Sequence, residues 1–270
     1  MNLSLTFGRR LWLLVLLFVL GGVLALLFQK LIMALPVDAQ ASLRISMVFQ
    51  QLLMFLLPAV GCAVMVTRRP AELLQIKSLP SAQMFGLALL TFLVSIPAMN
   101  CIIEAFENLP WSAEIVMAED VAKSTIEGLM GQGVVSAILS CCILAVLPGL
   151  CEELFFRGAL QNLLRSRPMS VHLAVWLAAI IFSLIHFQPI GFVPRMLLGA
   201  GFGYFAVWTG SLWTAIACHM VNNFISVMAM QTGVDPDIVG LSTPVVSIVS
   251  VVLTVVGLRM IYSRFMSRGM

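Results

Sequence analysis

The sequence predicts an all-α, polytopic membrane protein with about eight transmembrane helices, and its composition is the first reason. Hydrophobic residues make up 61% of the 270 residues and charged residues only 10%, whereas soluble domains carry about 25% charged residues. The apolar residues also gather in long stretches, with basic residues at alternate ends of these stretches. The longest polar interval, 104–130, is too short for a hydrophobic core of its own. We therefore expect one integral-membrane domain over residues 1–270.

The apolar stretches are each close to the ~17 to 25 residues that a membrane-spanning helix needs. They cover Leu11–Leu35, Ser46–Thr67, Met84–Ile103, Gly131–Leu150, Val171–Phe187, Phe192–Trp208, Ser211–Met230 and Leu241–Tyr262. The first is longer than the ~7 to 15 residues of a signal-peptide core, so we interpret it as a spanning helix. The fourth should continue past Leu150 to about Arg165, with Pro148 and Gly149 marking a kink or break.

The basic residues predict the orientation of these helices. With both termini in the cytoplasm, the cytoplasmic segments hold Arg9, Arg10, Arg68, Arg69, Lys77, Arg165, Arg167, Arg264 and Arg268. The opposite loops hold Lys30, Arg44, Lys123 and Arg195, and the longest of them is acidic. This asymmetry follows the positive-inside rule, and it explains the net charge of +3 without a nucleic-acid partner. Short loops without added domains favour a bacterial inner membrane.

The cysteines and glycines have structural interpretations. All six cysteines lie in or beside apolar stretches, where they behave as small hydrophobic residues. Gly199 and Gly203 have the spacing of close helix packing.

Two adjacent glutamates, Glu152 and Glu153, interrupt the fourth apolar helix. Burying a carboxylate in a membrane is costly, so an ionisable cluster there is a functional-site hypothesis by default. Arg157 follows Glu153 by four residues, which places the two on one helix face as an ion pair. Glu152 is rotated by about 100° and faces another wall. We expect Glu153 and Arg157 to support the site and Glu152, without an obvious partner, to be functional.

Two histidines lie inside later apolar stretches, and helix geometry can bring them to the glutamates. At about 1.5 Å per residue, Glu152, His186 and His219 can all lie near the middle of the membrane. Asn223 follows His219 by four residues and shares its face, whereas Asn222 should point elsewhere. These groups suit amide hydrolysis, with Glu152 as general base for a water held by His186. His219 and Asn223 could donate hydrogen bonds to the oxyanion.

These residues resemble the motifs of a known family. Glu152-Glu153-x-x-x-Arg157, Phe182-x-x-x-His186 and His219-x-x-x-Asn223 are similar to the three motifs of the CAAX prenyl protease and bacteriocin-processing (Abi) family of intramembrane endopeptidases. The resemblance covers a catalytic motif region at 145–228. It implies helices surrounding an intramembrane catalytic cavity that opens toward the cytosol.

The resemblance also implies residue roles. Glu152 and His186 would activate water, His219 and Asn223 would form the oxyanion hole, and Glu153 and Arg157 would support the site. It implies a glutamate-dependent mechanism with no cofactor and no metal. The substrate would be a peptide or a membrane-anchored protein, and the sequence does not decide whether it is prenylated.

Other functions remain open from the sequence. Glu152, His186 and His219 form a His2Glu set that could instead bind a catalytic zinc ion, which would make the protein a zinc-dependent protease. A non-proteolytic membrane scaffold, an immunity protein or a transporter with charges near the midplane is the other alternative.

Overall fold

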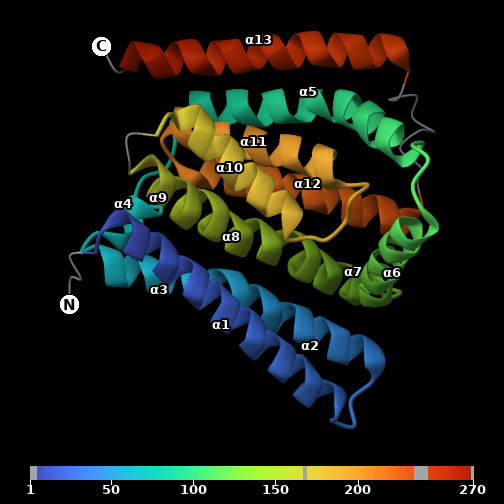
Figure 1. Ribbon diagram of the computed structural model, residues 1–270. Helices are drawn as coiled ribbons and strands as arrows, with labels where there is room; N and C mark the ends of the chain where they lie inside the picture. The colour runs from blue at the N-terminus through green and yellow to red at the C-terminus, as the bar shows by residue number, and fades with distance from the viewer. Residues whose placement is uncertain (1–4, 167–168, 234–242, 269–270) are drawn as a thin grey trace.

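The chain folds into a bundle of helices, as predicted (Figure 1). The computed structural model describes residues 5–166, 169–233 and 243–268, and this part of the chain contains no β-strand. Six helical regions in it are long and apolar enough to cross a membrane. They are α1 (Phe7–Met33), Ala39–Val66, α5 (Ala82–Glu107), Val134–Arg165, α12 (Leu212–Thr232) and Pro244–Ser267, which lies within α13 (Pro244–Arg268). The chain is therefore an integral membrane protein.

All the predicted apolar stretches contain a helix, but two of these helices are not among the six. One is α10 (Val171–Leu184), whose 14 residues reach only about 21 Å, less than the ~30 Å of a bilayer core. It ends before its predicted limit, and Phe187 lies in the following turn with φ 54°. The other is α11 (Phe192–Thr209). The count of eight spanning helices is not confirmed, and Leu241, where the last stretch was expected to begin, lies outside the described residues.

Local sequence signals set several helix ends. The Asp38 side chain accepts a hydrogen bond from the Ala41 N–H at 2.9 Å and caps the start of α2 (Ala39–Gln51). Gly210 and Gly233, with φ 72° and 65°, end α11 and α12. A left-handed residue closes a helix most easily when it has no Cβ, so these glycines fix where the two helices stop.

Two π-helices precede prolines in the spanning helices. In η1 (Leu52–Leu56) and η2 (Cys142–Val146), an N–H bonds to the carbonyl oxygen five residues earlier. Pro58 and Pro148 lie two residues after the ends of these segments and have no N–H to donate. The wider π-helical turns keep the backbone helical up to each proline. The feature at Pro148 is therefore a π-helical segment within one continuous helix rather than a break. The parts of that helix are α7 (Val134–Cys141), η2, α8 (Leu147–Glu153), η3 (Leu154–Gln161) and α9 (Asn162–Arg165), and α3 (Leu57–Val66) follows η1.

The helices form three groups around a buried centre (Figure 1). On one side α1 packs against α2, η1 and α3, and on the other α5 packs against α13. Between them lie α8, η3, α10, α11 and α12. Every residue of η3 is buried. This π-helix, directly after the glutamate pair, is therefore the centre of the bundle.

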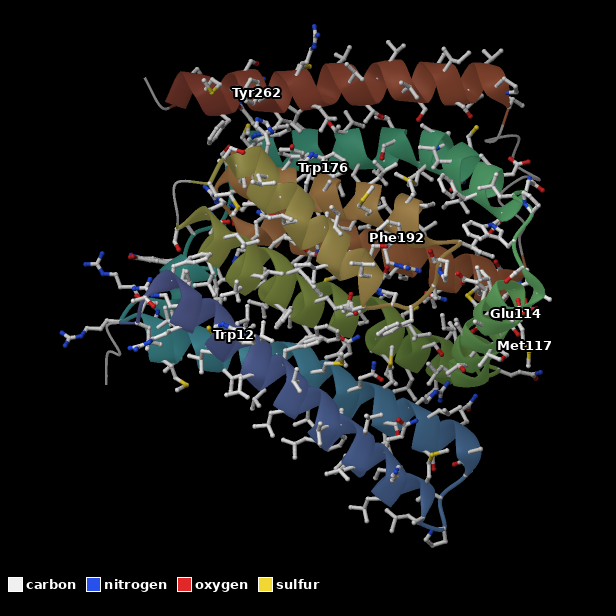
Figure 2. The ribbon with its side chains drawn as sticks, in the orientation of Figure 1. Trp12, Glu114, Met117, Trp176, Phe192 and Tyr262 are labelled. Carbon is white, nitrogen blue, oxygen red and sulfur yellow. The ribbon has the colours of Figure 1, made fainter. Side chains whose placement is uncertain are left out.

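The two ends of the bundle differ in charge. One end, which we call the basic end, has the start of α1, α4 (Pro70–Leu73) and α9 (Figure 1). Its basic residues include Arg9, Arg10, Arg68, Arg69, Lys77 and Arg165. The other end, which we call the α6 end, is covered by α6 (Ala113–Leu129), and Figure 2 shows Glu114 and Met117 there. Arg167 and the side chain of Arg268 lie outside the described residues.

Candidate active site

Glu153 and Arg157 form a fully buried ion pair at the centre of the bundle. Arg157 Nη1 lies 2.6 Å from Glu153 Oε1, and both side chains are 0% exposed. The other terminal nitrogen, Nη2, donates to the Gly199 carbonyl at 3.0 Å. The guanidinium carbon also lies 4.5 Å from the centre of the Phe182 ring, a cation–π distance. The predicted pairing of Glu153 with Arg157 is present, and Arg157 is held on three sides.

The glycines of α11 make room for these polar side chains. A Cβ on Gly199 would lie 2.8 Å from Arg157 Nη2, and a Cβ on Gly203 would lie 2.6 Å from Gln161 Oε1. Gln161 Nε2 in turn donates to the Gly203 carbonyl at 3.2 Å. The spacing expected for close helix packing therefore admits two buried polar side chains of η3, each of which bonds the glycine that it covers.

His219 contacts Glu153 and lies close to Glu152. Its Nδ1 is 2.8 Å from Glu153 Oε1, and its Nε2 is 3.9 Å from Glu152 Oε2. A carboxylate paired with a guanidinium accepts hydrogen bonds, so Nδ1 of His219 donates to Glu153 and Nε2 faces Glu152. The Phe202 ring stacks on the imidazole with centroids 5.3 Å apart. These contacts orient the ring completely.

A glycine allows α8 and α12 to approach closely at this level. A Cβ on Gly149 would lie 3.1 Å from the backbone nitrogen of Met220. Because Met220 follows His219, this contact places the imidazole directly beside the glutamate pair.

Glu152 has a partner that the sequence did not suggest. Its Oε1 accepts a hydrogen bond from Gln51 Nε2 at 2.9 Å. Gln51 ends α2, lies 101 residues away in sequence and is 2% exposed. The only sequence signal for it is the polar Gln50-Gln51 pair inside the second apolar stretch. Glu152 therefore has a neutral amide at one oxygen, while the other oxygen faces His219.

A cavity of about 460 Å³ joins the candidate catalytic residues, and Glu152, His186, His219, Asn222 and Asn223 all line it. His186 Nδ1 lies 2.7 Å from the Phe182 carbonyl. A carbonyl accepts hydrogen bonds, so Nδ1 of His186 donates and Nε2 is left to accept from a water molecule. In the described part of the chain no hydrogen bond or ion pair joins His186 to Glu152 directly. The two side chains meet only through the cavity.

Asn223 depends on Pro148 for its position. Asn223 Nδ2 donates to the Leu144 carbonyl at 3.2 Å. In an α-helix that carbonyl would accept from residue 148, but proline has no N–H. Asn222 Nδ2 donates to Asn223 Oδ1 at 3.2 Å, and Asn222 lines the same cavity. The expectation that Asn222 points elsewhere is therefore wrong, because the cavity is wide enough to reach both side chains.

The His2Glu alternative has a geometric test. Among the described residues no three His, Cys, Asp or Glu side chains are placed to hold one metal ion. Glu152, His186 and His219 all line the cavity, and in this arrangement their side chains are not gathered around one point. Nδ1 of each histidine is engaged, by Phe182 in one case and by Glu153 in the other, and Nε2 of each is left free, as it is in a histidine that binds a metal.

Comparison with known proteins agrees with the motifs. A family model described as type II CAAX prenyl endopeptidase Rce1-like matches residues 134–225. Over these residues the chain is similar to the CAAX prenyl endopeptidases. This region begins with α7, ends within α12 and contains Glu152, His186 and Asn223. Among curated proteins and solved structures there is no match to the chain. The CAAX endopeptidases are a protease family, and the resemblance inferred from the three motifs is confirmed.

The cavity extends toward the α6 end of the bundle. Its lining includes Glu107 and Glu119, which belong to the α6 end, and no residue of α4 or α9. If the basic end is cytoplasmic, as the positive-inside rule predicts, the cavity faces away from the cytosol. The predicted orientation and the cytosolic opening therefore conflict in this structure.

Proposed function

We propose that the chain is an intramembrane endopeptidase that hydrolyses peptide bonds of peptides or membrane-anchored proteins with a water molecule activated by Glu152. The observation that carries the proposal is the asymmetry of the glutamate pair. Glu153 is neutralised by Arg157 at 2.6 Å, whereas Glu152 contacts the amide of Gln51 and turns its second oxygen toward His219. Because the arginine binds Glu153 and not Glu152, the Glu152 carboxylate on the cavity wall is available as a general base.

The proposed reaction uses the cavity residues in order. A water held between Glu152 and His186 Nε2 gives a proton to Glu152, and its oxygen attacks the peptide carbonyl carbon. The carbonyl oxygen becomes an oxyanion that accepts hydrogen bonds from His219 and Asn223. The carbon–nitrogen bond then breaks, and Glu152 returns the proton to the leaving amine. The products are a carboxylic acid and an amine, so atoms and protons balance.

The proposed oxyanion hole uses one N–H of Asn223 and one of His219, and each of these side chains already donates one hydrogen bond within the protein. Asn223 uses one N–H on Leu144, which leaves the second N–H of its amide. His219 already donates from Nδ1 to Glu153, so donation from Nε2 requires a proton on both ring nitrogens. Glu153 and Arg157 then act as positioning residues that hold the His219 ring.

The remaining parts of the proposal concern the setting. We place the protein in a bacterial inner membrane with both termini in the cytoplasm, as one domain that needs no cofactor. Metal analysis of active protein tests the expected metal independence. Stoichiometric zinc whose removal abolishes cleavage would favour the zinc-dependent protease instead.

The decisive experiment compares cells that produce the natural protein with cells that produce Glu152→Gln. Peptide fragments released from membrane proteins are identified by mass spectrometry. We expect a set of fragments that the natural protein produces and E152Q does not. Glu114→Gln, a change of an exposed glutamate on α6, serves as the matched control and should keep the set. Identical fragments with folded E152Q would overturn the assignment and favour a scaffold or transporter.

A further inference from the structure

The cavity occupies only one half of the bundle. Along α12 its lining begins at His219 and continues to Met230, with no residue from the first two turns of that helix. Along α11, which runs in the opposite direction, the lining covers Gly191 to Phe202 and stops before the last two turns. Both helices therefore place the cavity between the level of His219 and the same end of the bundle.

The other helices give the same result. In the helix Val134–Arg165 the cavity is lined by Leu144, Pro148 and Glu152, and by no later residue. Toward the basic end the space is filled, because Phe156, Arg157 and Leu212 are each 0% exposed. Glu152 thus lies at the floor of the cavity, whose lining continues from there toward the α6 end.

The loop between α1 and α2 lies at this same end. Arg44 of α2 donates to the carbonyl of Leu129, the last residue of α6, at 2.9 Å. The α6 end therefore includes Lys30, which precedes this loop, and Lys123 on α6, whereas Lys77 lies at the basic end. By the positive-inside rule the α6 end is extracytoplasmic.

The mouth of the cavity carries excess negative charge. The charged residues that line it, apart from Glu152, are Glu107, Glu119 and Arg195. Arg195 Nη2 donates to Gln188 at 2.7 Å and Glu119 Oε1 accepts from the Ile190 N–H at 3.0 Å. Arg195 also interacts electrostatically with Glu119, so the two glutamates leave one negative charge in excess. The adjoining segment 104–130 adds further acidic side chains and a single lysine. A positively charged segment would be attracted to such a mouth.

We propose that the substrate enters this cavity from the extracytoplasmic side and carries lysine or arginine residues that bind at Glu107 and Glu119. This inference rests on the proposed endopeptidase function. The distance along α12 from His219 to Met230 is about 16 Å at 1.5 Å per residue. An extended peptide covers that distance in about five residues. The basic residues should therefore lie about five positions from the scissile bond.

The direction of entry can be tested without a substrate. The chain has three lysines, Lys30, Lys77 and Lys123, and all are exposed. A membrane-impermeant amine reagent is applied to intact spheroplasts that contain the natural protein, and the modified lysines are identified by mass spectrometry. We expect Lys30 and Lys123 to react, and Lys77 to react only after permeabilisation. Reaction of Lys77 alone in intact spheroplasts would overturn the proposed direction.

Charge preference is measured with purified protein in liposomes. The probes are two quenched fluorescent peptide libraries with the same randomised centre, one flanked by lysine pairs and the other by glutamate pairs. We expect a lower KM for the lysine library, and the Glu107→Gln/Glu119→Gln variant should raise that KM about three- to tenfold. Glu114→Gln, which is outside the cavity lining, should not.

The outcomes separate the two proposals. Equal KM values for both libraries with the natural protein would overturn the charge preference while leaving the endopeptidase function intact. Cleavage of neither library, with correct lysine labelling, would overturn the endopeptidase function and with it the proposed substrate.

Discussion

Gln51 Nε2 donates a hydrogen bond to Glu152 Oε1 at 2.9 Å and thereby links the second spanning helix to the glutamate pair. Both residues are buried, at 2% and 7% exposure. This contact is the one direct hydrogen bond to Glu152 among the described residues. It holds the carboxylate against the wall formed by α2, so that its second oxygen stays on the cavity side. Gln51 is therefore a positioning residue for the proposed general base.

Gln51→Leu should reduce both stability and activity. The change removes the donor and leaves a buried carboxylate oxygen unpaired, which costs about 1–3 kcal/mol. The expected result is a lower melting temperature in detergent and a lower kcat. Gln50→Leu is the matched control, because Gln50 is exposed and should change neither quantity. A pH–rate profile of Q51L that equals that of the natural protein would show that Gln51 does not act on Glu152.

The sequence predicts the local part of this site well. Glu153 and Arg157 are four residues apart on one helix, so helix geometry alone predicts their contact, and the structure has it. The proximity of His219 to the glutamates was inferred from depth in the membrane, and it is present too. These predictions succeed because regular helices convert sequence separation directly into position.

Contacts that depend on helix packing were not predictable. Gln51 reaches Glu152 because α2 packs against α8, and no local pattern says which helix the polar pair at positions 50 and 51 faces. The spacing of Gly199 and Gly203 indicated close packing but not that the partners are Arg157 and Gln161. The direction in which the cavity opens likewise depends on where the core fills the bundle.

The buried ion pair should be more important to stability than any exposed pair. Glu153→Gln or Arg157→Met each leaves a partner charge buried and uncompensated, at a cost of about 3–5 kcal/mol. The double variant should lose less than the sum of the two, because it removes both charges. The control is Glu72→Gln at the basic end, which breaks an exposed pair with Lys77 and should cost under about 1 kcal/mol.

The free energy of unfolding in mixed detergent is measured for these four variants and for the natural protein. Additive losses for E153Q and R157M would contradict direct coupling between the two side chains. Activity adds a second readout, because loss of Glu153 also releases His219 Nδ1 and should lower kcat beyond the effect on folding.

The glycines of α11 offer a test of shape. Gly199→Ala places a Cβ 2.8 Å from Arg157 Nη2, and Gly203→Ala places one 2.6 Å from Gln161 Oε1. Overpacking of this kind costs about 1–3 kcal/mol. Gly201→Ala in the same helix meets no atom within 4 Å, so it should be neutral or slightly stabilising. Equal melting temperatures for G199A and G201A would mean that Arg157 adjusts without cost.

Asn223 and Asn222 both line the cavity, and kinetics can separate their roles. If Asn223 donates to the oxyanion, Asn223→Ala should lower kcat about 10²- to 10³-fold, with little change in KM. The same change also removes the hydrogen bond to the Leu144 carbonyl, so part of its effect falls on stability.

Pro148→Ala restores an N–H that can satisfy that carbonyl. The double variant P148A/N223A should therefore recover the melting temperature but not kcat. Asn222→Ala, which removes only a bond to Asn223, should lower kcat far less. Recovery of kcat in P148A/N223A would show that Asn223 serves the helix rather than the reaction.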